Sequence, residues 1–554
     1  MSCLEDLPDL AILEIFGYLK STEIILSFFD LSERINNLLI EKHYFEDVCH
    51  LPLKIFNYMC NDIFPKMGRD MFSLKLSDQI SCGQLEIMKQ HHFCELLPNV
   101  TSLQLYVVNV HSLKYYFDIY LAQLHCLTIE YDGTKVPRVL GDSLFNKKTH
   151  LNSCILIGNV GIHFRHNEIQ KCFIQNLTLR LDTIIDLLLL FDNLPVLKRL
   201  NVKFNQKSLD YNDRNIRIID TYDYSSLQIK LPHLHDFTLK TNYNLTYEIF
   251  EMIIKNLKYL KRLHLSYTNY AEHGITESCL RNTLSHLKNL TELNLLLRII
   301  YFSIDYDKLK SNDDDKWKFY FSINETQKEY VLYTMPYFNS TFSMSFDMLL
   351  NTPNSHIFYS VKKLNLSNHN EQISFSQIAH ILNKKFPNLT CLTFGYVLKL
   401  SDSGLLSNIK LNKVMNVDFI HNTKYFQQFI LLLPNLKELK VSYSCLVKCN
   451  GLEQIFNKIR RLELFNYEFI TLITVLSHFL SLECLSLHLD KVDNHMEKEE
   501  KYRILYQIVD GMKTLYSLKI SSNYQEFLYY LYKMFSINSH MIVNLYDQTL
   551  SIWK

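Results

Sequence analysis

The sequence predicts a mixed α/β fold in which short parallel strands alternate with helices, preceded by a small helical segment at the amino terminus. A short apolar frame that returns along most of the chain indicates the parallel strands. Helical periodicity before several copies of the frame indicates the alternation, and helical periodicity without the frame sets residues 4–41 apart. The chain has 554 residues, of which 47% are hydrophobic, so it has enough apolar surface for several cores.

Residues 4–41 have the spacing of three short helices. Pro8 suits a first helical turn, and the stripe after it follows i, i+3, i+4, i+7 spacing: Ile12, Ile15, Phe16 and Leu19. Ser21 or Thr22 is the expected cap of a second helix, whose apolar face is Ile24, Ile25, Phe28 and Phe29, and Ile35, Leu38 and Leu39 mark a third. Helices this short cannot bury so much apolar surface among themselves. The segment therefore requires a partner, or docking onto the residues that follow.

The apolar frame reads Leu-x-x-Leu-x-Leu and often follows a Leu-Pro pair. Its most regular copies cover 97–105, 194–202, 231–239, 257–265, 287–295, 386–394, 433–441 and 479–487, and a degenerate unit around Leu151, Cys154 and Leu156 bridges a wide gap. This spacing matches the leucine-rich repeat of roughly 20–29 residues, in which each unit supplies one strand and a return segment. We therefore expect a horseshoe with parallel strands on its concave face and helices outside, although leucine-rich helices can imitate the frame by chance.

The polar residues inside the frame are candidates for target binding. Strand side chains alternate, so the residue between the last two apolar positions points away from the core and lines the concave face. The candidates on and beside that row are Arg199, Asn201, Arg262, His264, Asn294, Lys363, Asn365, Asp418, Lys440 and Glu463. Their charges are mixed, whereas nucleic-acid binding requires a continuous basic stripe. The face predicts protein recognition, with a solvated surface as the alternative for any single residue.

The frame lapses between Leu290 and Val361, and the chain ends without it. Alternating apolar runs at 317–323, 330–333 and 342–346 predict a β-hairpin insertion, whose aromatic residues are expected to pack on the adjacent repeats, with a hot spot for a partner as the alternative. The end of the chain predicts a capping hairpin around Asp547-Gln548. The expected organisation is helical domain 1–49, linking helices 50–95, repeats 96–298, insertion 299–357, repeats 358–534 and cap 535–554.

Residues 4–41 resemble the F-box, whose pattern runs roughly Leu-Pro, a few residues, Ile-Phe-x-Tyr-Leu, an acidic residue with two leucines, and Val-Cys-x-x-Trp. The match falls on Leu7, Pro8, Ile15, Phe16, Tyr18, Leu19, Glu23, Ile24 and Ile25. The departures are Leu10, where the family often has Glu, and Leu31, Ser32 and Ile35 in place of Val, Cys and Trp. An F-box followed by leucine-rich repeats is a familiar architecture of substrate receptors in Skp-cullin-F-box ubiquitin ligases.

This resemblance implies a non-catalytic receptor that docks on a Skp-type adaptor and its cullin scaffold while the repeats hold a protein target for ubiquitination and degradation. The adaptor-binding residues that it implies are Leu7, Pro8, Ile12, Ile15, Phe16, Leu19, Ile24 and Ile25. The alternative is a leucine-rich-repeat interaction scaffold without a ligase role, in which the same apolar stripe only caps the array. An enzyme with catalytic residues far apart in the sequence is a third possibility.

Composition and motifs argue against other classes of function. The 58 Lys and Arg balance 57 Asp and Glu, and the 12 Gly form no phosphate-binding motif, so we expect no nucleic-acid partner, cofactor or enzyme activity. His91-His92-Phe93-Cys94 lacks the further ligands of a metal site, and Asp313-Asp314-Asp315 predicts a solvated loop. The 13 Cys without a C-x-x-C pair and the acidic start favour a cytoplasmic or nuclear location. Charges such as Asp186 interrupt the apolar runs, so no membrane span is expected.

Overall fold

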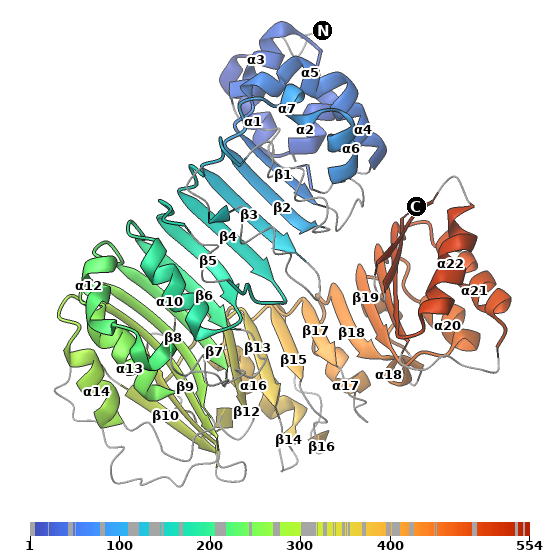
Figure 1. The fold of residues 1–554 in the computed structure, drawn as a ribbon. Coiled ribbons are helices and arrows are strands. Elements are labelled where there is room, and N and C mark those ends of the chain that lie inside the picture. The colour runs from blue at the N-terminus through green and yellow to red at the C-terminus, as the bar shows by residue number, and fades with distance from the viewer. Residues whose placement is uncertain are drawn as a thin grey trace. The chain divides into compact units, whose positions relative to one another are not determined.

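The chain folds into two compact units, Met1–Trp317 and Lys318–Lys554. The computed structural model describes residues 6–19, 21–41, 48–49, 51, 53–77, 84–108, 121–131, 144–145, 149–164, 170–204, 218–242, 246–269, 277–300, 317, 319–324, 329–335, 337, 340–345, 349–350, 352, 355–367, 373–394, 400–401, 410–419, 426–447, 449, 451–489, 496–537, 541–546 and 549–553. Both units combine helices with large parallel sheets, which confirms the predicted α/β class and the parallel pairing (Figure 1).

In the first unit, successive strands lie side by side in chain order within one sheet, each parallel to the next. The strands are β1 (Ser73–Ser77), β2 (Ser102–Val108), β3 (Cys126–Tyr131), β4 (Ser153–Gly158), β5 (Asn176–Leu181), β6 (Arg199–Phe204), β7 (Asp236–Asn242), β8 (Arg262–Asn269) and β9 (Glu292–Ile300). In β8, Leu263 and Leu265 are buried, while His264 between them is partly exposed. The period-two burial follows from the pleat of the strand, and it separates an apolar face from a polar face.

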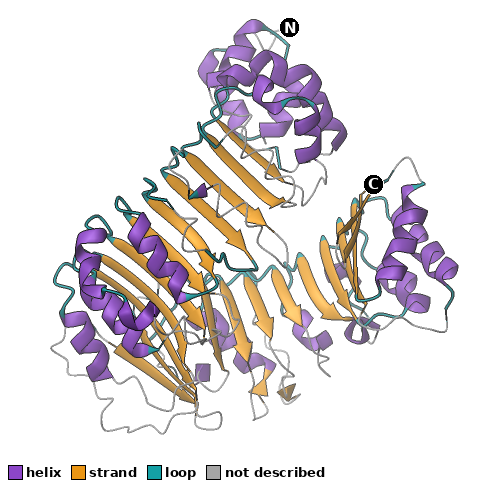
Figure 2. Cartoon of the chain, viewed as in Figure 1, coloured by secondary structure: helices purple, strands orange, loops and turns teal. Residues whose placement is uncertain are grey.

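The helices of the first unit fall into an amino-terminal group and a group in the later repeats. They are α1 (Asp9–Gly17), α2 (Ser21–Phe28), α3 (Glu33–Glu41), α4 (Leu53–Tyr58), η2 (Met59–Ile63), α5 (Phe64–Met67), η3 (Gly68–Asp70), α6 (Gln84–Gln90), α7 (Phe93–Leu96), α10 (Ile184–Asn193), η4 (Tyr224–Ser226), α12 (Leu227–Lys230), α13 (Tyr247–Asn256) and α14 (Glu277–Ser285). Figure 2 shows the later helices on one side of the strands.

Helix α10 shows how local sequence signals set these elements. It begins with a capping box, in which the Thr183 hydroxyl accepts from the Asp186 amide while the Asp186 carboxylate accepts from the Thr183 amide at 2.9 Å. The fully buried Asp186 also accepts from the Phe164 amide at 2.8 Å. A charge that interrupts an apolar run in the sequence is thus a hydrogen-bonded part of the core.

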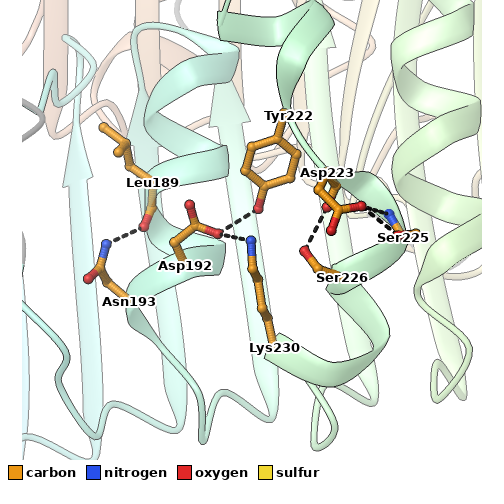
Figure 3. Close-up of polar contacts among 8 residues, drawn as sticks. All are labelled: Leu189, Asp192, Asn193, Tyr222, Asp223, Ser225, Ser226 and Lys230. Carbon is orange, nitrogen blue, oxygen red and sulfur yellow. Dashed lines mark hydrogen bonds and ion pairs between the residues drawn. The ribbon is translucent and has the colours of Figure 1, made fainter.

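The other end of α10 is tied to the next repeat. The Asp192 carboxylate accepts hydrogen bonds from the Tyr222 hydroxyl at 2.8 Å and from Lys230 Nζ at 2.7 Å (Figure 3). Lys230 Nζ also lies 4.8 Å from the centroid of the Tyr222 ring, and Asp223 caps η4 through the Ser225 amide. Burial and the bond to Asp192 raise the pKa of Tyr222, so this hydroxyl stays a hydrogen-bond donor. These contacts hold α10 against α12.

The second unit is built on a sheet in the order β12-β13-β15-β17-β18-β19-β20-β21-β23-β22. The strands of the second unit, in that sheet and outside it, are β10 (Phe319–Asn324), β11 (Glu329–Thr334), β12 (Thr341–Ser345), β13 (Lys363–Ser367), β14 (Ile373–Ser374), β15 (Cys391–Phe394), β16 (Leu400–Ser401), β17 (Asn416–Phe419), β18 (Glu438–Ser442), β19 (Arg461–Phe465), β20 (Cys484–Leu489), β21 (Ser517–Ser522), β22 (Ile542–Tyr546) and β23 (Thr549–Trp553). Its helices are α16 (Phe375–Lys385), α17 (Phe426–Ile430), α18 (Tyr443–Val447), α19 (Glu453–Phe456), α20 (Phe469–Leu476), α21 (Lys498–Gly511) and α22 (Gln525–Ser536).

Both ends of the second unit contain antiparallel pairs. Strands β10 and β11 pair with each other as a hairpin, and β22 and β23 form a second hairpin in which β23 also pairs antiparallel with β21. The remaining neighbours from β12 to β21 are parallel. Asp313-Asp314-Asp315 and Asp547-Gln548, the centre of the expected capping hairpin, lie outside the described residues.

Two segments differ from the sequence expectation. Residues 50–95, expected to be linking helices only, also contain strand β1, which pairs with β2 and buries Leu74 and Leu76. Met71 holds the place of the first leucine of the frame and is buried, so a repeat begins here. Strand β12, expected to belong to the insertion, instead pairs in parallel with β13 and extends the second sheet.

Candidate functional site

The amino-terminal helices divide the predicted adaptor-binding residues into buried and exposed sets. Ile12, Phe16, Ile24 and Ile25 are at most 1% exposed and form the core of this segment, where the Phe16 ring lies 5.0 Å from that of Phe28. The other four face solvent to different degrees: Leu7 is half-buried, Pro8 is exposed, and Ile15 and Leu19 are 37% and 38% exposed. A buried side chain cannot reach a partner unless the helices open, so contact falls to the exposed set.

Large apolar side chains on this segment are left uncovered. They form the set that we call the exposed apolar set: Leu10, Ile15, Tyr18, Leu19, Leu26 and Leu31. Leu10 is 81% exposed, Tyr18 84% and Leu31 56%. Leu10 and Ile15 lie on α1, and Tyr18 and Leu19 follow directly after its last residue, Gly17. Leu10 and Leu31 depart from the F-box pattern, and the structure places both among the most exposed apolar residues of the segment.

Polar contacts fix the geometry of these helices. Arg34 on α3 donates to Asp9 Oδ1 at 2.5 Å through Nη2 and at 2.8 Å through Nε, and it also donates to the Leu7 carbonyl at 2.6 Å. Asp30, at φ 65°, receives Lys66 Nζ at 2.8 Å, which ties α2 and α3 to the helices that follow. No sequence motif predicts these pairs, because each pair joins residues that are 25 or more positions apart.

The polar face of the first sheet carries a row of alternating charges on adjacent strands. The row runs Arg199, Asp236, Arg262 and Glu292 in register. Asp236 Oδ2 lies 3.2 Å from Arg199 Nε, and Arg262 donates to the same carboxylate through Nε at 2.6 Å and through Nη2. The hydrogen bond to Asp236 raises the pKa of Arg262. Alternating charges across strands stabilise the sheet and leave this row without a strong net field.

His264 lies in the next row of the first sheet. Its Nε2 is 3.4 Å from Glu292 Oε1, and its Nδ1 is 3.3 Å from the side-chain nitrogen of Asn294, which is fully buried. Burial lowers the pKa of His264, against the opposing effect of Glu292 and Asp236. Asn201, the remaining candidate of this sheet, is partly exposed in the same row.

The second sheet has a comparable polar face. Glu463 Oε1 lies 3.0 Å from Lys440 Nζ and 2.7 Å from His488 Nε2, and the His488 ring stacks on Phe465 at 4.5 Å. Burial tends to raise the pKa of Glu463, but the hydrogen bonds from His488 and Lys440 outweigh it and lower that pKa. These three side chains thus form one charged cluster on this face.

The remaining candidates of the second sheet occupy the same face. Asn365 donates to the Ser343 hydroxyl at 2.9 Å, while Lys363 is exposed and Asp418 is partly exposed. The ten candidates from the sequence thus divide between the two units. In the first unit Arg199 and Arg262 meet at Asp236, and in the second unit Lys440 meets Glu463.

Two further observations concern metals and membranes. Among the described residues, no three His, Cys, Asp or Glu side chains are grouped so that they would hold a metal ion. Within the same part of the chain, no helix combines the length and apolar character needed to cross a bilayer.

Comparisons with known proteins identify no family. No protein-family model and no curated protein matches the chain. Among solved structures, the chain is similar to one in the crystal structure of the Rad7 and Elc1 complex in yeast, with 13% sequence identity, over 75% of this chain and 98% of that chain. The TM-score is 0.26.

Proposed function

We propose that the chain is the substrate-recognition subunit of a Skp-cullin-F-box ubiquitin ligase, with a leucine-rich-repeat array joined to an F-box. The observation that carries this proposal is the exposed apolar set on helices that also match the F-box pattern. Exposed apolar residues clustered on a small segment are typical of a protein interface. In this role the amino-terminal helices hold a Skp-type adaptor, and the repeats hold a protein target in the cytoplasm or nucleus.

Catalysis in this mechanism belongs to other subunits. The chain accelerates ubiquitination because tethering raises the effective concentration of the target's lysines near the enzyme that is loaded with ubiquitin. The polar faces of the sheets supply charged groups such as Lys440 and Glu463 for protein recognition. Their mixed charge suits an interface with a protein better than one with a polyanion.

A repeat scaffold with no ligase role is the second candidate. It is favoured by the contacts that join the amino-terminal helices to the rest of the unit, such as the ion pair between Asp30 and Lys66 and the approach of Lys66 Nζ to 5.4 Å from the Phe29 ring. In that case the helices are a cap, and adaptors do not bind. The exposed apolar set has no role in this alternative.

Adaptor binding by a surface variant separates the two candidates. Tyr18→Ser with Leu31→Ser removes two exposed side chains, and Ile229→Ser with Ile470→Ser is the matched control, because those residues are 76% and 73% exposed outside the segment. Loss of an interface hot spot costs about 2 kcal/mol or more, so we expect roughly 30-fold weaker binding of a purified Skp-type adaptor in titration calorimetry. Unchanged affinity in the first variant, or no binding by the unmodified protein, contradicts the receptor proposal.

A further inference from the structure

A hollow of about 1170 Å³ runs along one edge of the second sheet, where strands β13 to β21 begin. We call it the edge groove. A buried apolar residue, such as Leu436 before β18, precedes each of these strands. The residues directly before and directly after it in the sequence form the two rows that line the groove. The row after that residue contains Lys362, Lys437 and Arg460, and the row before it contains Lys413 and Lys458.

The backbone spaces the lining residues regularly. The Lys437 amide donates to the Met415 carbonyl, and the Arg460 amide donates to the Lys437 carbonyl, each at 2.8 Å. Each strand therefore carries one residue of the row, at the strand spacing of about 4.8 Å. Six strand steps between β13 and β21 give the groove a length of about 29 Å. An extended segment of about nine residues has the same length, at about 3.3 Å per residue.

The groove has a strong excess of positive charge. Its five cations are all exposed, and Glu483 is the one carboxylate that lines it. In the described part of the chain, Arg460 is the one groove cation beside a carboxylate, with Nη1 3.5 Å from Glu483 Oε1. Lys413 and Lys458 donate to neutral oxygens, the Asn388 side chain and the Pro434 carbonyl, each at 3.1 Å. On the sheet face, in contrast, Lys440 Nζ lies 3.0 Å from Glu463 Oε1.

We propose that the edge groove binds an extended acidic segment of a protein. The row of cations is complementary to a run of Asp and Glu, and the length of the groove matches such a segment. Nucleic acid fits less well, because strand binding relies on aromatic platforms and Tyr516 is the single aromatic residue in the lining. The proposal goes beyond the ligase role and does not depend on adaptor binding.

Fluorescence anisotropy with defined probes tests this proposal. The probes are a labelled Asp/Glu peptide of about ten residues, the same peptide with Asn/Gln, and a single-stranded oligonucleotide of equal charge. Lys413→Glu with Lys437→Glu reverses two groove charges, and Arg503→Glu with Lys533→Glu is the control with the same charge change on α21 and α22. Thermal unfolding confirms that both variants fold.

The proposal predicts saturable binding of the acidic peptide that weakens as salt rises, and no binding of the amide peptide. The groove variant should bind the acidic peptide at least about tenfold more weakly, while the control variant keeps its affinity within about twofold. Equal losses in the two variants would show non-specific attraction and overturn the proposal. Tighter binding of the oligonucleotide, or no saturable binding of the acidic peptide, overturns it as well.

Discussion

Phe16 and Tyr18 are two residues apart, yet the structure predicts opposite consequences for their loss. Phe16 is fully buried against Phe28, whereas Tyr18 is 84% exposed. Phe16→Ala removes a ring from the core of a small helical segment, at a cost of about 3–5 kcal/mol. Tyr18→Ala removes almost no packing, so its effect on stability should stay within about 0.5 kcal/mol.

Hydrogen exchange in α1 and α2 measures this difference locally. A loss of about 3 kcal/mol raises the open population roughly 150-fold, because each 1.4 kcal/mol is a factor of ten. We therefore expect Phe16→Ala to speed amide exchange in both helices and to weaken adaptor binding indirectly. Tyr18→Ala should weaken adaptor binding while protection is retained. Normal protection in Phe16→Ala, or lost protection in Tyr18→Ala, would refute the assignment of core and surface in this segment.

Other predictions concern buried polar groups and strand β1. Asp186→Ala should destabilise the first unit by on the order of 3 kcal/mol in chemical denaturation, because the amides of Phe164 and Thr183 lose their acceptor. Asp192→Ala should cost about 1 kcal/mol or less, because Asp192 is partly exposed. Equal losses in the two variants would contradict this prediction. Leu74→Ala should cost about 2–5 kcal/mol and speed exchange in β1 and β2, and unchanged exchange would argue against a strand there. Lys385 is 2% exposed and donates to the Leu349 and Thr352 carbonyls, and burial lowers its pKa from 10.5 to about 8. Between pH 8 and 10.5 the unfolded chain binds more protons at Lys385 than the folded chain does. The free energy of unfolding of the wild type should therefore rise over this range relative to that of Lys385→Met. A difference between the two proteins that does not change with pH would contradict the lowered pKa of this amine.

The repeated frame predicts the sheets well because strand burial has a period of two. Leu263 and Leu265 point into the core and His264 points out, as the spacing of the frame requires. Strand β1 escaped this reasoning because Met71 replaces the leucine that marks the start of the frame. Methionine and leucine side chains are buried equally well in a core, but a pattern that requires leucine does not match methionine.

The candidate surfaces were only partly predictable. Helical periodicity identifies a stripe such as Ile12, Ile15, Phe16 and Leu19, but it does not say which edge of the stripe neighbouring helices cover. The ion pair of Asp9 with Arg34, which links α1 to α3, joins residues 25 positions apart. The edge groove was missed for a different reason. Its cations, such as Lys437, lie in the segments that lead into β13, β17, β18 and β19, and they come together only when these strands pair.

Assembly with purified adaptor and cullin tests the central claim most directly. The unmodified chain is mixed with a Skp-type adaptor and its cullin, and the mass of the eluted species is measured by size-exclusion chromatography with light scattering. The receptor role predicts one species whose mass equals the chain, adaptor and cullin together, and its loss when Tyr18 and Leu31 are replaced by Ser. Separate elution of the unmodified chain beside an intact adaptor-cullin complex would contradict the role and favour the repeat scaffold.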